Sequence, residues 1–207
     1  MAAKVRVLCA LLAGVAAVAR ASDADESALS VAKLYPYLVT DAYLERGGRE
    51  LSKALGHGVS IALVFDLGQV VQSATSDNLR TLRLSVGQAH QVALENLQRL
   101  VRANEVKMMV LPTGPDSRPF VLVGGHWAAA TAILLPNLLH MVAAPLGTQD
   151  VCASIPHREA MLIFACGDRA YRDQMRALVR EKESDGAKPL TYGLFRVGGH
   201  SVVPLVE

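Results

Sequence analysis

The protein has 207 residues, of which 51% are hydrophobic, and a formal net charge of +2 at pH 7. That length and composition supply one apolar core of ordinary domain size. Because the chain is nearly neutral and has no dense run of lysine and arginine, it lacks the electrostatic footprint of a nucleic-acid-binding protein, and we expect no nucleic-acid partner.

The first 21 residues have the three parts of a secretory signal peptide. A basic start with Lys4 and Arg6 precedes an apolar run over 7–19, and small residues stand at the last and third-last positions, just before an acidic stretch. The apolar run is too short to span a bilayer, which needs about 20 residues. We therefore predict an exported protein, periplasmic or secreted, whose mature chain has no transmembrane segment. The alternative is an N-terminal core helix or an uncleaved membrane anchor.

Cleavage after residue 21 changes the charge balance of the chain. It removes three basic residues, Lys4, Arg6 and Arg20, and leaves 18 basic residues against 19 acidic ones, for a net charge of −1. The argument against a nucleic-acid partner therefore applies to the mature chain as well.

Periodicity and turn residues predict the elements of the amino-terminal half. We expect 34–39 to be extended because Pro36 blocks a helix, whereas helical spacing of apolar residues predicts a helix over 41–55. The nearly continuous apolar run 59–65 predicts a strand, with 69–74 as its hairpin partner.

The best-specified element is a helix over 84–104. Its apolar residues recur every three or four positions, and its polar residues collect on the opposite side. Ser85 with Gln88 three residues later is a capping-box pattern, and Asn104 is a residue type that accepts the left-handed turn at a helix end. We expect this helix to lie against a sheet.

The carboxyl-terminal half alternates strand pairs with helices. Three pairs of apolar segments flank turn residues and predict hairpins: 106–111 with 120–123, 151–155 with 161–165, and 194–197 with 201–206. An apolar helix, 127–141, which Pro136 kinks or divides, and a charged helix, 169–185, separate them. Because short loops join antiparallel neighbours, we predict a single α+β domain over 22–207, a largely antiparallel sheet of hairpins alternating with covering helices.

Three motifs stand in a distinctive order along the chain. They are Ala-Leu-Glu-Asn-Leu at 93–97, the stretch 151–164 around Ile-Pro-His-Arg-Glu, and Gly-Leu-Phe-Arg-Val at 193–197. Their order and spacing resemble the YtpQ-like bacterial family, a domain of unknown function, over most of 34–207. The resemblance implies no reaction and no residue role, because that family has no established activity.

Two Gly-Gly-His turns are candidate ligand-binding sites. Gly124, Gly125 and His126 join a strand to a helix, where backbone amides can bind a phosphate or carboxylate, and His200 occupies a matching turn. With His57, these imidazoles would form a zinc site only if the fold brought them together. The alternative is plain tight turns, and the sequence predicts no metal and no cofactor.

The turn 156–159 contains candidate acid–base residues. His157 and Glu159 have the chemistry that a hydrolase needs, although charged turns are usually solvated, and no Gly-x-Ser-x-Gly motif occurs. We interpret the chain as a binding or interaction module for an unknown ligand or protein, with a hydrolase as the alternative, and leave open whether it is an enzyme. A pocket that contains His157 or Glu159 would favour the hydrolase; an apolar patch or a sheet edge would favour the binding module.

Cys152 and Cys166 flank the same turn on neighbouring predicted strands. Counting outward from the turn puts them nearly opposite each other, and an exported location favours a disulfide. A shift of one residue in the turn would point them to opposite faces and leave two buried thiols instead. Both alternatives are compatible with the sequence.

Overall fold

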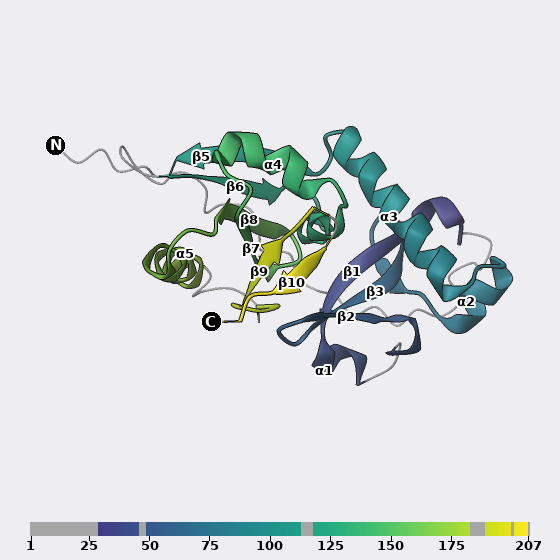
Figure 1. Ribbon diagram of the computed structural model, residues 1–207. Coiled ribbons are helices and arrows are strands. Elements are labelled where there is room, and N and C mark those ends of the chain that lie inside the picture. Colours follow the sequence, from purple (N-terminus) through teal and green to yellow (C-terminus); the bar gives the residue numbers. More distant parts are fainter. Residues whose placement is uncertain (1–28, 46–48, 113–117, 183–188, 200, 207) are drawn as a thin grey trace.

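Two antiparallel sheets with helices packed against them form the computed structural model (Figure 1). It describes residues 29–45, 49–112, 118–182, 189–199 and 201–206. The α+β prediction is confirmed, with the strands divided between two sheets instead of gathered in one. The predicted signal peptide, 1–21, and His200 lie outside the described residues.

The first sheet has the strand order β1-β3-β2, with β4 also beside β3. Its strands are β1 (Leu34–Thr40), β2 (Lys53–Gly56), β3 (Val59–Asp66) and β4 (Val71–Ser73). The predicted extended segment is β1, which follows the 3-10 turn η2 (Val31–Lys33) and pairs with β3 along its whole length. The predicted hairpin of β3 and β4 is confirmed.

The helix predicted over 41–55 is wrong. Over the described residues 41–45 and 49–52, the chain forms the short α1 (Asp41–Leu44) and the 3-10 turn η3 (Arg49–Leu51) before it enters β2. Glycines at 47 and 48 weaken a helix there, by about 1 kcal/mol each relative to alanine. Pairing of β2 with β3 then gives the backbone groups of 53–56 their hydrogen-bond partners. The sheet therefore forms although the apolar residues have helical spacing.

The second sheet has the order β10-β9-β7-β8-β6-β5. Its strands are β5 (Lys107–Pro112), β6 (Pro119–Gly124), β7 (Val151–His157), β8 (Ala160–Ala165), β9 (Leu194–Val197) and β10 (Val202–Pro204). All three predicted strand pairs of the carboxyl-terminal half are confirmed. The β7–β8 pair contains a register shift just before its turn.

The long predicted helix is α3 (Val86–Arg102), which follows the short α2 (Ser76–Thr81) and lies alongside β1 (Figure 1). Both hydrogen bonds of the Ser85–Gln88 capping box are present, and Asn104 takes a left-handed φ of 58° after the helix. Leu97 is fully buried on the face that packs against the sheets.

Pro136 divides the second predicted helix, as expected from the donor that proline lacks. The two parts are the 3-10 helix η4 (Ala129–Leu134) and α4 (Leu138–Leu146), which pack on one face of the second sheet. Helix α5 (Arg169–Lys182) covers the other face through Met175. Within the described residues, no helix is long and apolar enough to cross a membrane.

One hydrophobic core extends from the first sheet into the second. It contains Leu38 of β1 and Val59 of β3 together with Leu97 of α3 and the inner faces of β6, β7 and β8. At the other end of the junction, the imidazole Nε2 of His57 lies 2.9 Å from the carbonyl oxygen of Leu194. The two sheets are therefore joined by shared core side chains and by the contacts of His57 with Leu194 and Phe195.

Candidate functional site

Two turns that the sequence singles out meet at the edge of β1. The β7–β8 turn reaches it through Arg158, whose Nε donates to the carbonyl oxygen of Leu38 at 2.9 Å. The loop after β6 reaches it through Trp127, whose ring centroid lies 5.8 Å from those of Tyr35 and Tyr37. The backbone N–H of Ala130, in η4 just after that loop, donates to the carbonyl of Arg158 at 2.9 Å and ties the two segments together.

The alternation of β1 explains why its tyrosines are available to this cluster. Leu34, Pro36 and Leu38 are buried, so Tyr35 and Tyr37 lie together on the opposite, half-buried face. The carbonyls of Leu34 and Leu38 accept from side chains outside the sheet rather than from β3. Pro36 lies between them. Its backbone nitrogen points away from β3, so β3 loses no hydrogen bond because proline lacks an N–H.

The aromatic cluster, defined as Tyr35, Tyr37, His126 and Trp127, is anchored to Asp66 at the end of β3. The indole Nε1–H of Trp127 donates to Asp66 Oδ2 at 3.3 Å, and the backbone N–H of Gly68 donates to Asp66 Oδ1 at 2.8 Å. One donor on each oxygen fixes the carboxylate while leaving lone pairs for a further partner.

A pocket of about 320 Å³ opens beside this cluster, where β1 begins and β3 ends. It is lined by Lys33, Tyr35, Asp66, Leu67 and Gly68. Leu34 pairs with Phe65, and Lys33 of η2 and Asp66 of β3 are the next residues beyond that pair. The pocket therefore presents an ammonium group, a carboxylate and an aromatic ring around one opening.

Burial sets the protonation of the two tyrosines. It raises the pKa of Tyr35, and the negative charge of Asp66 raises it further. Burial also raises the pKa of Tyr37, against the opposing effect of Arg158, whose guanidinium lies 5.0 Å from the ring centroid. Both phenols therefore stay protonated at neutral pH and act as hydrogen-bonding groups, not as bases.

His126 is a neutral donor at this site. Burial lowers the pKa of its imidazole and outweighs the negative charges of Glu105 and Asp66, which raise that pKa. Its Nδ1 accepts from the backbone N–H of Ala128 at 3.1 Å, so the neutral ring has its proton on Nε2. The cluster thus offers several neutral donors beside the Asp66 carboxylate.

The predicted glycine–histidine site lies beside the pocket but does not line it. Gly125 has a φ of +84°, which requires glycine, and a side chain on Gly124 would contact the carbonyl of Glu159. Gly125 therefore has a conformational role in the turn that positions Trp127, whereas a Cβ on Gly124 would lie 3.7 Å from its nearest neighbour, an ordinary contact. Anion binding by this turn stays a prediction.

His157 and Glu159 do not line the pocket either. His157 ends β7 and is half-buried, whereas Glu159 is exposed in the turn. Within the described part of the chain, no group of three or more His, Cys, Asp or Glu side chains could hold a metal ion. His57, one of the proposed zinc ligands, instead packs against the Phe195 ring and bonds the Leu194 carbonyl.

Cys152 and Cys166 lie as a disulfide pair with Cα atoms 4.7 Å apart. Cys152 is opposite Phe164, so Cys166 stands two residues further along on the same face of β7 and β8. The backbone N–H of Cys166 donates to the carbonyl of Asp150 at 2.8 Å, which continues the pairing beyond the strands. The register therefore points both side chains toward α5.

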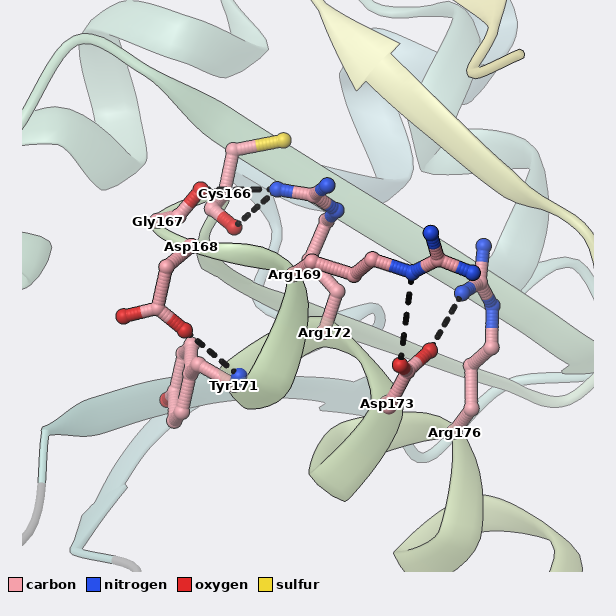
Figure 2. Close-up of polar contacts among 8 residues, drawn as sticks. All are labelled: Cys166, Gly167, Asp168, Arg169, Tyr171, Arg172, Asp173 and Arg176. Atoms are coloured by element: carbon pink, nitrogen blue, oxygen red, sulfur yellow. Dashed lines mark hydrogen bonds and ion pairs between the residues drawn. The ribbon is translucent and has the colours of Figure 1, made fainter. Parts of the chain in front are cut away.

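Figure 2 shows how the chain after Cys166 anchors α5. Asp168 accepts from the backbone N–H of Tyr171 at 2.8 Å, and Arg172 donates to the carbonyl of Gly167 at 2.7 Å. Asp173 lies 3.8 Å from Arg169 and 3.0 Å from Arg176. These charges bind one another and the backbone, and we interpret this charged cluster as structural support for the helix start.

No family model, curated protein sequence or solved structure matches the chain. The resemblance to the YtpQ-like family therefore stays a prediction, and the argument about function depends on the pocket and its neighbours.

The residues that line the pocket carry no strong signal that singles them out in the sequence. Lys33, Tyr35 and Asp66 belong to no motif, and the register of β1 with β3 is what brings them together. Two signals were present: tyrosines two residues apart beside Pro36, and an Asp-Leu-Gly turn directly after an apolar strand.

Proposed function

We propose that the protein is a binding module whose pocket between Lys33 and Asp66 holds a small zwitterionic ligand, such as a free amino acid. One observation carries the proposal: opposite charges and an aromatic ring line the same opening. The ammonium of Lys33 would bind a ligand carboxylate, and the carboxylate of Asp66 would bind a ligand ammonium group. The Tyr35 ring would cover the apolar part of the ligand.

Preorganisation of the acidic side supports this proposal. Asp66 is held by the N–H of Gly68 and the indole N–H of Trp127 before any ligand arrives. A group that is already fixed loses little conformational entropy when it binds, so more of its interaction contributes to affinity.

The arrangement gives no comparable support to the hydrolase alternative. The pocket lining contains no serine, cysteine or histidine, and the candidate acid–base residues His157 and Glu159 lie outside it. A binding module needs only the complementary charges that the pocket has.

The proposal includes export of the protein. Cleavage of the predicted signal peptide after residue 21 would deliver the pocket to the periplasm or the medium. Mass spectrometry of the secreted or periplasmic protein should find a chain that starts at or near Ser22. An intact chain from Met1 in the cytoplasm would contradict this part of the proposal.

Trp127 makes the test direct because it is the one tryptophan of the sequence and its indole touches Asp66. Titration with each of the 20 standard amino acids should give a saturable fluorescence change with at least one of them. Isothermal titration calorimetry should then show that Lys33→Met and Asp66→Asn each raise Kd about tenfold, equivalent to about 1.4 kcal/mol.

Asp77→Asn is the matched control for Asp66→Asn. Asp77 is an exposed acid on α2 that pairs with Arg80 and does not line the pocket. This variant should bind like the parent. No saturable response to any amino acid, or equal Kd values for all three variants, would contradict the proposed function.

A further inference from the structure

Among the described residues, β5 is the outermost strand of the second sheet and has β6 as its neighbour on one side. The side chains of Met109 and Val110 on it are 41% and 52% exposed. By contrast, β1 and β2, which lie at the contact between the two sheets, have other parts of the chain against them. Side chains of Asn96 and Arg158 bond the free edge of β1, and Pro204 of β10 packs directly on Gly56 of β2.

The register of β5 with β6 shows which backbone groups are free at this edge. Pro112 is opposite Pro119, and neither has an N–H, so this pair cannot be a hydrogen-bonded pair. Hydrogen-bonded and non-hydrogen-bonded residue pairs alternate along an antiparallel ladder, and the β5–β6 ladder has no register shift. The pairs of Val110 and Met108 with β6 are therefore also non-hydrogen-bonded. The N–H and C=O groups of Met108 and Val110 therefore point away from β6.

We propose that two copies of the chain pair antiparallel through β5, with the Met109 residues facing each other across a twofold axis. In that register Met108 of one copy exchanges backbone hydrogen bonds with Val110 of the other, and Val110 with Met108. The outward N–H and C=O groups of Met108 and Val110 in one copy thus find all their hydrogen-bond partners in the same groups of the other copy. The second sheet becomes continuous across the dimer.

The side chains of β5 also match those of a second copy. Met109 would face Met109, Met108 would face Val110, and only Lys107 would have a partner of different character, Leu111. The two Lys107 ammonium groups would lie at opposite ends of the paired strands, so they would not repel each other. Apolar pairing of this kind favours a second copy over a charged or polar peptide.

Cysteine cross-linking tests the register itself. Paired Met109 residues form a non-hydrogen-bonded pair with Cα atoms about 4.5 Å apart, within the range of about 4.4–6.8 Å that a disulfide accepts. Two Val110 residues would be roughly 8 Å apart or more, beyond that range. Diamide should therefore convert Met109→Cys to a covalent dimer and leave Val110→Cys uncoupled. Equal cross-linking of both, or none of either, would overturn the proposal.

Sedimentation analysis tests the dimer without a covalent bond. The parent should sediment with twice the mass of one chain, and Val110→Lys should raise the dimer Kd at least tenfold. Val203→Lys is the matched control, because Val203 is 49% exposed on β10 at the opposite end of the same sheet, and it should leave Kd unchanged. The proposal would be overturned if the parent remained a monomer at a protein concentration of about 100 μM, or if Val110→Lys left the dimer intact.

Discussion

Arg158 of the β7–β8 turn bonds the carbonyl oxygen of Leu38 at 2.9 Å, and this contact joins the second sheet to the free edge of the first. The same guanidinium lies 5.0 Å from the centroid of the Tyr37 ring. One side chain thus closes a sheet edge and supports the aromatic cluster beside the pocket.

Arg158→Ala should therefore destabilise the fold. It leaves a carbonyl of the fully buried Leu38 without its donor, at a cost of about 1–3 kcal/mol. Urea denaturation should show the loss as a lower midpoint with an unchanged slope. Arg80→Ala is the control, because the Arg80–Asp77 pair is exposed and should contribute less than about 1 kcal/mol. Equal midpoints for the two variants would contradict the role of Arg158.

Two Gly→Ala substitutions should have effects of opposite sign. A side chain on Gly193 would come within 2.4 Å of the His57 ring, at the junction of the two sheets, so Gly193→Ala should destabilise the protein. Gly87 lies in the first turn of α3 with open space around it, so Gly87→Ala should stabilise it by about 0.4–1 kcal/mol. Thermal unfolding should give a lower Tm than the parent for Gly193→Ala and a higher Tm for Gly87→Ala. A stabilised Gly193→Ala would show that the His57 contact is not tight.

The elements that could be predicted from sequence are those with local signals. The capping box of Ser85 and Gln88 and the division at Pro136 each depend on residues a few positions apart, and the structure contains both. The helix expected over 41–55 was wrong because pairing of β2 with β3, a contact between different segments, decided the conformation.

The candidate site could not be predicted for the same physical reason. Tyr35, Asp66 and Trp127 lie far apart in the chain, and only the register of β1 with β3 and the packing of the loop after β6 bring them together. The sequence favours the turns at 124–126 and 156–159 as candidate sites because of their own chemistry, and that remains a prediction. In the structure the two turns also position Trp127 and Arg158 against β1.

His126 should make stability depend on pH near neutrality. Burial lowers its pKa in the folded state, so as pH falls through the ordinary value of about 6.5 the unfolded chain takes up a proton first. Stability is therefore fully present above about pH 6.5 and is lost as pH falls toward the lower folded pKa. His90, whose pKa burial also lowers, acts in the same direction.

His126→Gln should flatten this part of the profile without abolishing it, since His90 still contributes. Free energies of unfolding measured from pH 8 to pH 5 in urea give the slope. His140→Gln is the control, because His140 is exposed on α4. A slope that His126→Gln leaves unchanged would contradict the assignment of a half-buried, neutral imidazole.

Under the proposed export, Cys152 and Cys166 should be oxidised in the mature protein. If residues 1–21 are removed, Cys9 is lost with them and these are the only cysteines left, so the denatured, unreduced chain should show no reactive thiol. Cys166→Ser should expose one thiol, that of Cys152, which verifies the labelling. The bridge joins residues 14 apart, and closing a loop of that size stabilises a fold by about 3 kcal/mol in the chain-entropy description. Reduction should therefore lower the urea midpoint of the parent and leave that of Cys166→Ser unchanged. Two reactive thiols per parent chain would reject the bridge and leave two buried thiols packed beneath α5.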